Sequence, residues 1–71
     1  MEQRINKLKG YRTMANLSQK EMAERAGINE RTYQNKENGV TEFTLSEATN
    51  IVKVLKECGI DITLSDLINE L

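Results

Sequence analysis

The stretch that most constrains the fold of this chain is LSQKEMAERAGINERTYQNKENG, residues 17–39. Ser18 followed by Glu21 is a capping-box pair, in which the hydroxyl accepts from a free helical N–H and the carboxylate reaches back to the cap. Gly27 supplies a residue that adopts the left-handed conformation at little cost and so ends the helix. The stretch therefore predicts two short helices joined by a tight turn, which is the helix-turn-helix arrangement.

Helical patterns also precede and follow this stretch. Apolar residues recur there at three- and four-residue steps, the spacing of one helical face. A second capping box begins at Thr44, Gly59 ends that helix, and Thr63 with Asp66 caps a last short one. We therefore predict an all-α, compact five-helix fold in which residues 1–71 form a single domain. The predicted helices cover residues 2–15, 18–26, 29–37, 45–58 and 64–70.

Composition excludes several classes of protein. No apolar run approaches the roughly 18 residues of a membrane span, and MEQRINKLKG has no apolar core of a signal peptide. The single cysteine, Cys58, rules out a disulfide framework, so we expect a cytoplasmic protein with no membrane partner. The chain has no His, no paired Cys and no Gly-rich phosphate loop, so we expect no enzyme activity, catalytic residue, metal or cofactor.

Charge is divided unevenly along the chain. Residues 1–36 hold eight Lys or Arg and four acids, a net charge of +4, whereas residues 37–71 hold two and seven, a net charge of −5. Such asymmetry indicates an end that faces a polyanion. It is equally typical of two solvated faces with no partner, and charge alone does not decide between these interpretations.

Residues 8–39, LKGYRTMANLSQKEMAERAGINERTYQNKENG, resemble the lambda-repressor-like (XRE/Cro-type) helix-turn-helix family. The resemblance extends over about residues 4–58 and implies a five-helix domain that binds operator DNA, usually as a two-fold dimer, to regulate transcription. The matching residues are Leu8, Arg12, Leu17, Ser18, Gln19, Glu21, Ala23, Gly27, Ile28, Thr32, Tyr33, Glu37, Asn38 and Gly39, followed by Leu45, Ala48, Ile51 and Leu55.

The resemblance also implies which residues contact DNA, and these belong to both helices of the motif. Ser18 matches a phosphate contact made at a helix N-terminus, and Gln19 matches a contact to a phosphate or a base edge. Glu30 and Arg31 match the main base-reading positions, and the others match groove, cap or phosphate positions. The expected DNA-contacting residues are Ser18, Gln19, Asn29, Glu30, Arg31, Thr32, Asn35 and Asn38.

The chemistry of these side chains fits such roles. Arg31 suits a bidentate contact to the O6 and N7 of guanine, and Gln19 and Asn35 suit the N6/N7 edge of adenine. The alternative interpretation of Arg31 is a solvated surface charge, and we favour the contact to DNA. Glu30 can accept from cytosine N4, but an acid in the first turn of a helix is also stabilised by the macrodipole. Both interpretations of Glu30 stay open.

The resemblance further implies a buried or half-buried ion pair between Arg12 and Glu37.

Three residues depart from the family pattern. Lys36 stands where a large apolar residue is usual, so we expect its stem to cover the core edge and its ammonium to reach solvent or phosphate. Phe43 stands where Pro is frequent and is expected to fill the space left by Lys36, while Glu42 would be repelled by nearby DNA. With few phosphate contacts, we expect moderate affinity and a shallow salt dependence.

The C-terminal segment is unusually apolar. Its side chains either close the core of the protomer or face a second subunit, and we favour a homodimer because exposed apolar patches usually mark interfaces. The expected function is sequence-specific transcription regulation, with double-stranded DNA carrying a pseudo-palindromic operator as the partner. The alternative is a protein-interaction module, such as an antitoxin or an anti-repressor partner. The expected dimer interface comprises Ile60, Ile62, Leu67, Ile68 and Leu71.

Overall fold

A computed structural model describes residues 6–68 of the chain and the side chains of residues 8–67. This part contains five helices and no strand, which confirms the predicted all-α class. The second, third and fourth helices lie within one residue of their predicted bounds, and the predicted helical residues 2–5 and 69–70 lie outside the described range. The helices are α1 (Asn6–Met14), α2 (Gln19–Ala26), α3 (Glu30–Glu37), α4 (Leu45–Glu57) and α5 (Leu64–Ile68).

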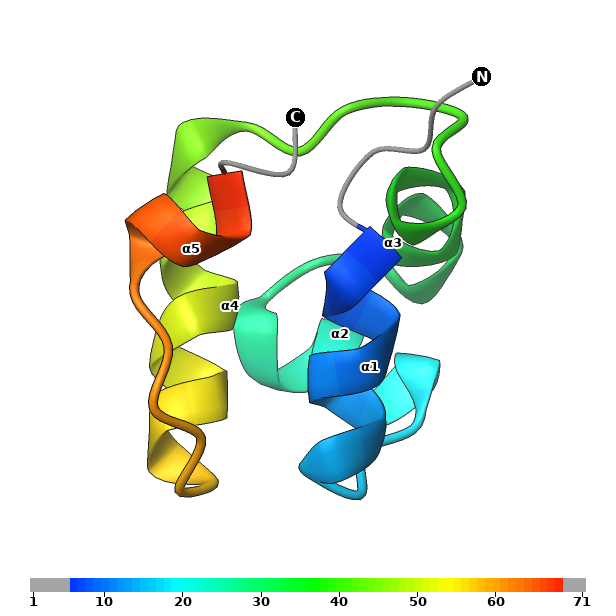
Figure 1. The fold of residues 1–71 in the computed structure, drawn as a ribbon. Coiled ribbons are helices and arrows are strands. Elements are labelled where there is room, and N and C mark those ends of the chain that lie inside the picture. The colour runs from blue at the N-terminus through cyan, green and yellow to red at the C-terminus, as the bar shows by residue number, and fades with distance from the viewer. Residues whose placement is uncertain (1–5, 69–71) are drawn as a thin grey trace.

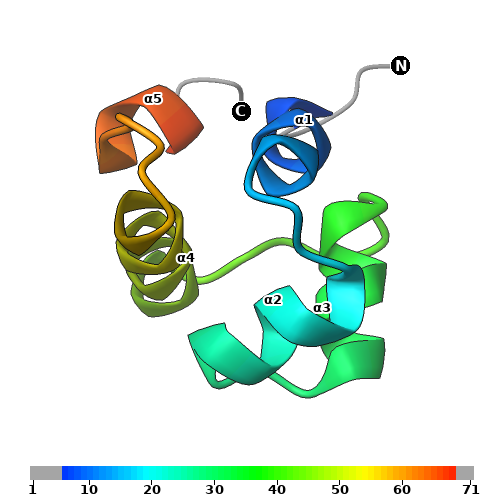
Figure 2. The ribbon, with the colours of Figure 1, turned by 90° about the horizontal axis from the view of Figure 1, so that it is seen from below.

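The helices pack so that α2 contacts both α3 and α4, α1 contacts α3, and α5 folds back along α4 (Figure 1). Seen from below, α2 lies at the edge of the molecule opposite α1 and α5, with α3 beside it (Figure 2). The pair α2 and α3 therefore presents an outer surface that the other helices leave uncovered.

No helix within the described range is long and apolar enough to cross a membrane.

The core is aliphatic except for one tyrosine. Tyr33 on α3 is fully buried, and the ring of Phe43 packs on it with centroids 5.8 Å apart. Phe43 thus packs against the core, and its filling of the space left by Lys36 stays a prediction. The buried apolar residues are Leu8, Met22, Ala23, Ala26, Tyr33, Ala48, Ile51, Val52, Val54, Leu55, Ile62 and Leu67.

The position of the C-terminal segment corrects the expected dimer interface. Ile62 and Leu67 are only 1% and 0% exposed, because α5 folds onto α4 and closes the protomer's own core. These two residues therefore have no surface left for a second subunit, and we withdraw them from the interface. Ile60 is half-buried against the same core, and the side chains of Ile68 and Leu71 lie outside the described residues.

Candidate nucleic-acid interface

The turn between α2 and α3 fixes how the two helices are placed. Gly27 has φ 76°, the left-handed conformation, and the N–H of Ile28 donates a hydrogen bond to the carbonyl of Ala23 at 2.8 Å. Asn29 then caps α3, since its Oδ1 accepts from the N–H of Arg31 at 2.9 Å. Both helix ends are thus hydrogen-bonded within the turn, so α3 has a defined direction relative to α2.

Ser18 begins α2 with the predicted capping box. Its Oγ accepts from the Glu21 N–H at 3.0 Å, and its own N–H donates to the Glu21 carboxylate at 2.9 Å. These hydrogen bonds from Ser18 hold the pKa of Glu21 below its usual value. Ser18 is exposed, and its hydroxyl keeps a proton to donate, so it can serve as cap and as a donor to phosphate together.

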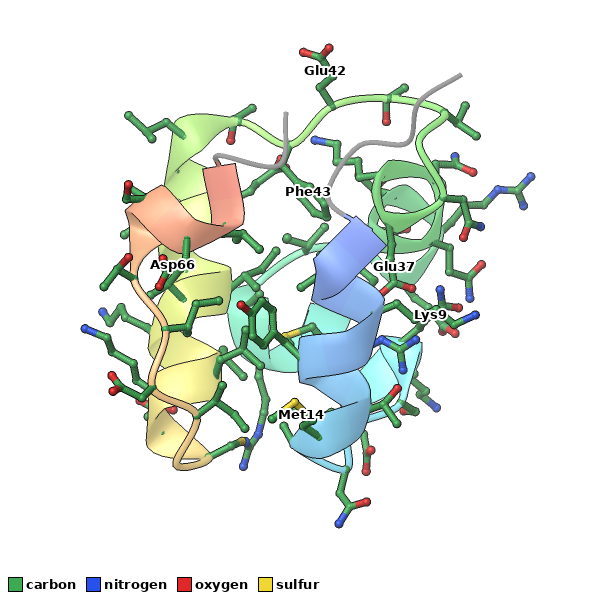
Figure 3. The ribbon with its side chains drawn as sticks, viewed as in Figure 1. Lys9, Met14, Glu37, Glu42, Phe43 and Asp66 are labelled. Carbon is green, nitrogen blue, oxygen red and sulfur yellow. The ribbon has the colours of Figure 1, made fainter. Side chains whose placement is uncertain are left out.

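Glu37 joins three helices through a buried hydrogen-bond cluster. Arg12 Nε donates to Oε2 at 2.8 Å, and Arg12 Nη2 to Oε1 at 3.3 Å. The Tyr33 hydroxyl donates to Oε2 at 3.0 Å, and the Gln19 amide donates to Oε1. Arg12 also donates to the carbonyl of Leu17 at 2.8 Å. The expected pairing of Arg12 with Glu37 is therefore one part of a larger cluster. At its centre, Glu37 lies between α1 and α3 (Figure 3).

The cluster sets the ionisation of its members. Burial raises the pKa of Glu37, but hydrogen bonds from Arg12, Gln19 and Tyr33 lower it by more, so the net pKa is below its usual value. The hydrogen bond to Glu37 raises the pKa of Arg12, and burial raises the pKa of the Tyr33 phenol. At neutral pH the cluster therefore holds a carboxylate, a guanidinium and a neutral phenol.

Gln19, an expected DNA contact, has its amide orientation fixed by this cluster. A carboxylate only accepts hydrogen bonds, so the nitrogen of the amide must face Glu37. One N–H and the carbonyl oxygen of Gln19 stay available at the start of α2. The structure thus places Gln19 between the buried cluster and the uncovered surface of the motif.

The outward face of α3 carries the expected reading residues. Arg31 and Asn35 are both exposed and lie one helical turn apart, on the face opposite buried Tyr33. Within the described residues, the side chains of Arg31 and Asn35 have no hydrogen-bond or ion-pair partner. Glu30 is exposed at the first residue of α3, and Asn38 is exposed just after its end. Half-buried Thr32 lies at the side of this face.

Lys36 differs from expectation in the direction of its ammonium group. Its Nζ forms an ion pair with Glu47 Oε1, which also accepts from the Thr44 N–H at 2.9 Å. The two side chains are 13% and 23% exposed, so the pair is largely shielded from water. Lys36 therefore ties the end of α3 to the start of α4 and does not extend toward solvent or a phosphate.

Further cations border the motif. Lys20 is exposed on α2, and Lys9 on α1 extends to the side of the molecule on which α3 lies (Figure 3). Glu42 projects outward from the loop between α3 and α4 (Figure 3). Two of the positive charges of residues 1–36 thus lie exposed near the motif helices, and charge alone still does not decide between a polyanion-facing end and a solvated face.

The expected site residues omit Gln34, which the structure places on the same helix as the reading residues. Its Nε2 donates to Glu30 Oε2 at 3.1 Å. The signal in the sequence is the four-residue spacing of Glu30 and Gln34, which brings two side chains together on a helix.

Comparisons with known proteins agree with this geometry. A family model described as Helix-turn-helix matches residues 8–62, a range that contains α2, α3 and α4 in full. Neither the curated proteins nor the solved structures gave a match. The match covers more than half of the chain and includes the whole motif with its turn.

Proposed function

The chain belongs to the lambda-repressor-like helix-turn-helix family of DNA-binding regulators, and from that premise we propose that it is a sequence-specific transcriptional repressor. The observation that carries the proposal is the outward face of α3, on which Arg31 and Asn35 are exposed opposite the buried Tyr33. In this proposal α3 lies in the major groove and the bound protein excludes polymerase, as a Cro-like protein of a prokaryote or phage would.

Each expected contact has a chemical basis. Arg31 donates two hydrogen bonds to guanine O6 and N7, and Asn35 reads adenine farther along the groove. Ser18 and Gln19 at the start of α2, together with Asn38 after α3, bind phosphates and set the register of the protein on the duplex. Because Lys36 is paired with Glu47, it adds no phosphate contact, which supports moderate affinity and a shallow salt slope.

We propose that the regulator acts in the cytoplasm as a homodimer on a pseudo-palindromic operator, with half-sites about 10–10.5 bp apart. Two exposed apolar side chains support a partner surface, since Val40 is 69% and Leu45 is 64% exposed. Sedimentation of the free protein tests this part. A species that stays monomeric at high micromolar concentration contradicts a dimer formed without DNA.

Binding to DNA is tested by gel shift at low and at physiological salt, first on random DNA and then on DNA flanking the chain's own gene. Arg31→Ala should weaken the complex with the flanking DNA by about 5- to 150-fold, because it removes the proposed bidentate guanine contact. Arg25→Ala is the matched control. Arg25 donates to Cys58 Sγ at 3.3 Å at the other end of α2, so its loss removes the same charge without touching α3.

The outcomes separate the two functions considered. Specific binding of the flanking DNA by the wild type and the Arg25→Ala variant, weakened in Arg31→Ala, supports the repressor. Absence of binding at low salt, with all three proteins alike, overturns it and favours a protein-interaction module such as an antitoxin or an anti-repressor partner. A reporter gene driven by the bound flanking DNA then distinguishes repression from activation.

A further inference from the structure

Glu30 and Gln34 form a hydrogen-bonded pair on α3. Gln34 Nε2 donates to Glu30 Oε2 at 3.1 Å, with Glu30 exposed and Gln34 half-buried. We propose that Gln34 is a specificity-determining residue that reads adenine, and that Glu30 is its positioning residue. This inference rests on the proposed function, since it assumes that α3 enters the major groove.

The position of the pair favours contact with bases. Side chains on a helix lean toward its N-terminus, so the amide of Gln34 lies over the first turn of α3, beside Glu30. The N-terminal residues of a recognition helix are the ones that meet base edges. The hydrogen bond to Glu30 therefore brings the Gln34 amide to the part of α3 where reading takes place.

The hydrogen bond also fixes which atoms Gln34 presents. The Glu30 carboxylate is an acceptor, so the nitrogen of the amide faces it and the carbonyl oxygen faces away. One N–H of the amide and its carbonyl oxygen stay unused within the described residues. A glutamine with these two groups free matches adenine, which offers the N7 acceptor and the N6 donor in the major groove.

Glu30 then has a role that does not require it to meet DNA itself. Its carboxylate lies in the first turn of α3, where the helix macrodipole stabilises a negative charge. One of its oxygens accepts the hydrogen bond from Gln34. An i, i+4 pair that merely supports the helix would change stability slightly and leave base preference unaltered. Base preference is therefore the measurement that separates the two roles.

The test selects binding sites from a random DNA pool with the wild-type protein, and then measures binding to every single-base variant of the selected site. Gln34→Ala should lose discrimination at one A·T pair per half-site, by about 5- to 150-fold, the value of one bidentate contact. Glu30→Ala should lose discrimination at that same pair, whereas Glu30→Gln, which keeps a carbonyl acceptor for the amide, should retain most of it. Glu57→Ala removes an exposed carboxylate from the end of α4 and is the matched control, and thermal melts of each variant verify folding.

Each result has a distinct meaning. A Gln34→Ala protein that keeps the wild-type preference at every position overturns the inference and leaves the proposed function intact. A Glu30→Ala protein that changes a different base pair from Gln34→Ala overturns the positioning role, because Glu30 then reads a base itself. A wild-type protein that selects no sequence overturns the proposed function, and the assignment of Gln34 as a reader is overturned with it.

Discussion

Arg12 and Glu37 lie 25 residues apart in the chain, yet Arg12 Nε donates to Glu37 Oε2 at 2.8 Å, at a site largely shielded from solvent. Their side chains are 11% and 3% exposed. Glu37 also accepts from Gln19 and Tyr33, and no buried polar side-chain atom among the described residues lacks a partner. A polar cluster that is fully hydrogen-bonded specifies one arrangement of the helices around it. Here that arrangement sets the position of α2 and α3 against α1.

Replacing Arg12 by Met should lower the free energy of unfolding by about 3–5 kcal/mol, because Glu37 becomes an uncompensated buried charge. The whole stability of a domain this small is of similar size, so we expect the variant to be largely unfolded at 37 °C. Thermal melts followed by circular dichroism measure this. Arg31→Met, which removes an exposed arginine, is the control and should melt as the wild type does.

A double variant tests whether charge or packing causes the loss. Arg12→Met combined with Glu37→Gln removes both charges and keeps a carbonyl that can accept from the Tyr33 hydroxyl. We expect it to be more stable than Arg12→Met alone. A melting temperature unchanged by Arg12→Met would contradict the role of the pair, and a double variant worse than the single one would contradict its electrostatic origin.

Stability should fall in acid. In the folded protein, the pKa values of Glu21, Glu37 and Glu47 all lie below the ordinary value of 4.5, which the unfolded chain is expected to show. The unfolded state therefore binds protons more readily. The stabilisation from these groups is fully present above pH 4.5 and is lost as the pH falls through the folded-state values.

Denaturant titrations between about pH 7 and about pH 3 measure this dependence. The largest part should come from Glu37, the most buried of the three carboxylates. The Arg12→Met/Glu37→Gln variant should accordingly show a shallower acid limb than the wild type. A free energy of unfolding that stays constant or rises over this range would contradict the assigned direction.

Local signals explain why so much of the fold could be predicted. The capping boxes of Ser18 with Glu21 and of Thr44 with Glu47 join residues three apart, so the sequence alone is enough to find them. The contact of Lys36 with Glu47 spans 11 residues, and the direction of a long flexible side chain is not set by its neighbours in the chain. Local pattern therefore placed the helices and left this tertiary ion pair unpredicted.

The C-terminal segment shows a second limit of sequence pattern. A buried apolar residue looks the same whether its own protomer or a second subunit covers it, and only the packing of α5 on α4 assigns Leu67 to the core. The pair of Glu30 and Gln34 is a different case, because its four-residue spacing is local and visible in the sequence. The spacing predicts the contact of Gln34 with Glu30, whereas the role of this contact in DNA recognition depends on which face of α3 is uncovered.

The assignment of Leu67 to the core leads to a stability prediction. Leu67→Ala should lower the free energy of unfolding by about 2–5 kcal/mol, since it removes a fully buried side chain and leaves a cavity. Met14→Ala is the matched control, because Met14 is 68% exposed and lies outside the proposed partner surface, so its loss should have little effect. Melts at several protein concentrations distinguish a core residue from an interface residue. If Leu67→Ala leaves the melting temperature unchanged and only weakens self-association, Leu67 belongs to a dimer interface after all.

Ser18 combines a cap with a proposed phosphate contact, and two substitutions separate these roles. Ser18→Ala removes the oxygen that accepts from the Glu21 N–H, so it should cost about 1 kcal/mol of stability. For a domain of this size that corresponds to a decrease in melting temperature of about 4–8 °C.

Ser18→Asp keeps a capping oxygen and should melt close to the wild type, but its negative charge faces the proposed phosphate. We therefore expect Ser18→Asp to lower DNA affinity by about tenfold or more at low salt, with the difference shrinking as salt rises. Ser46→Asp places the same charge in the first turn of α4 and should leave DNA binding unaffected. Equal losses from Ser18→Asp and Ser46→Asp would indicate a general charge effect, and a Ser18→Asp protein that binds like the wild type would remove Ser18 from the interface.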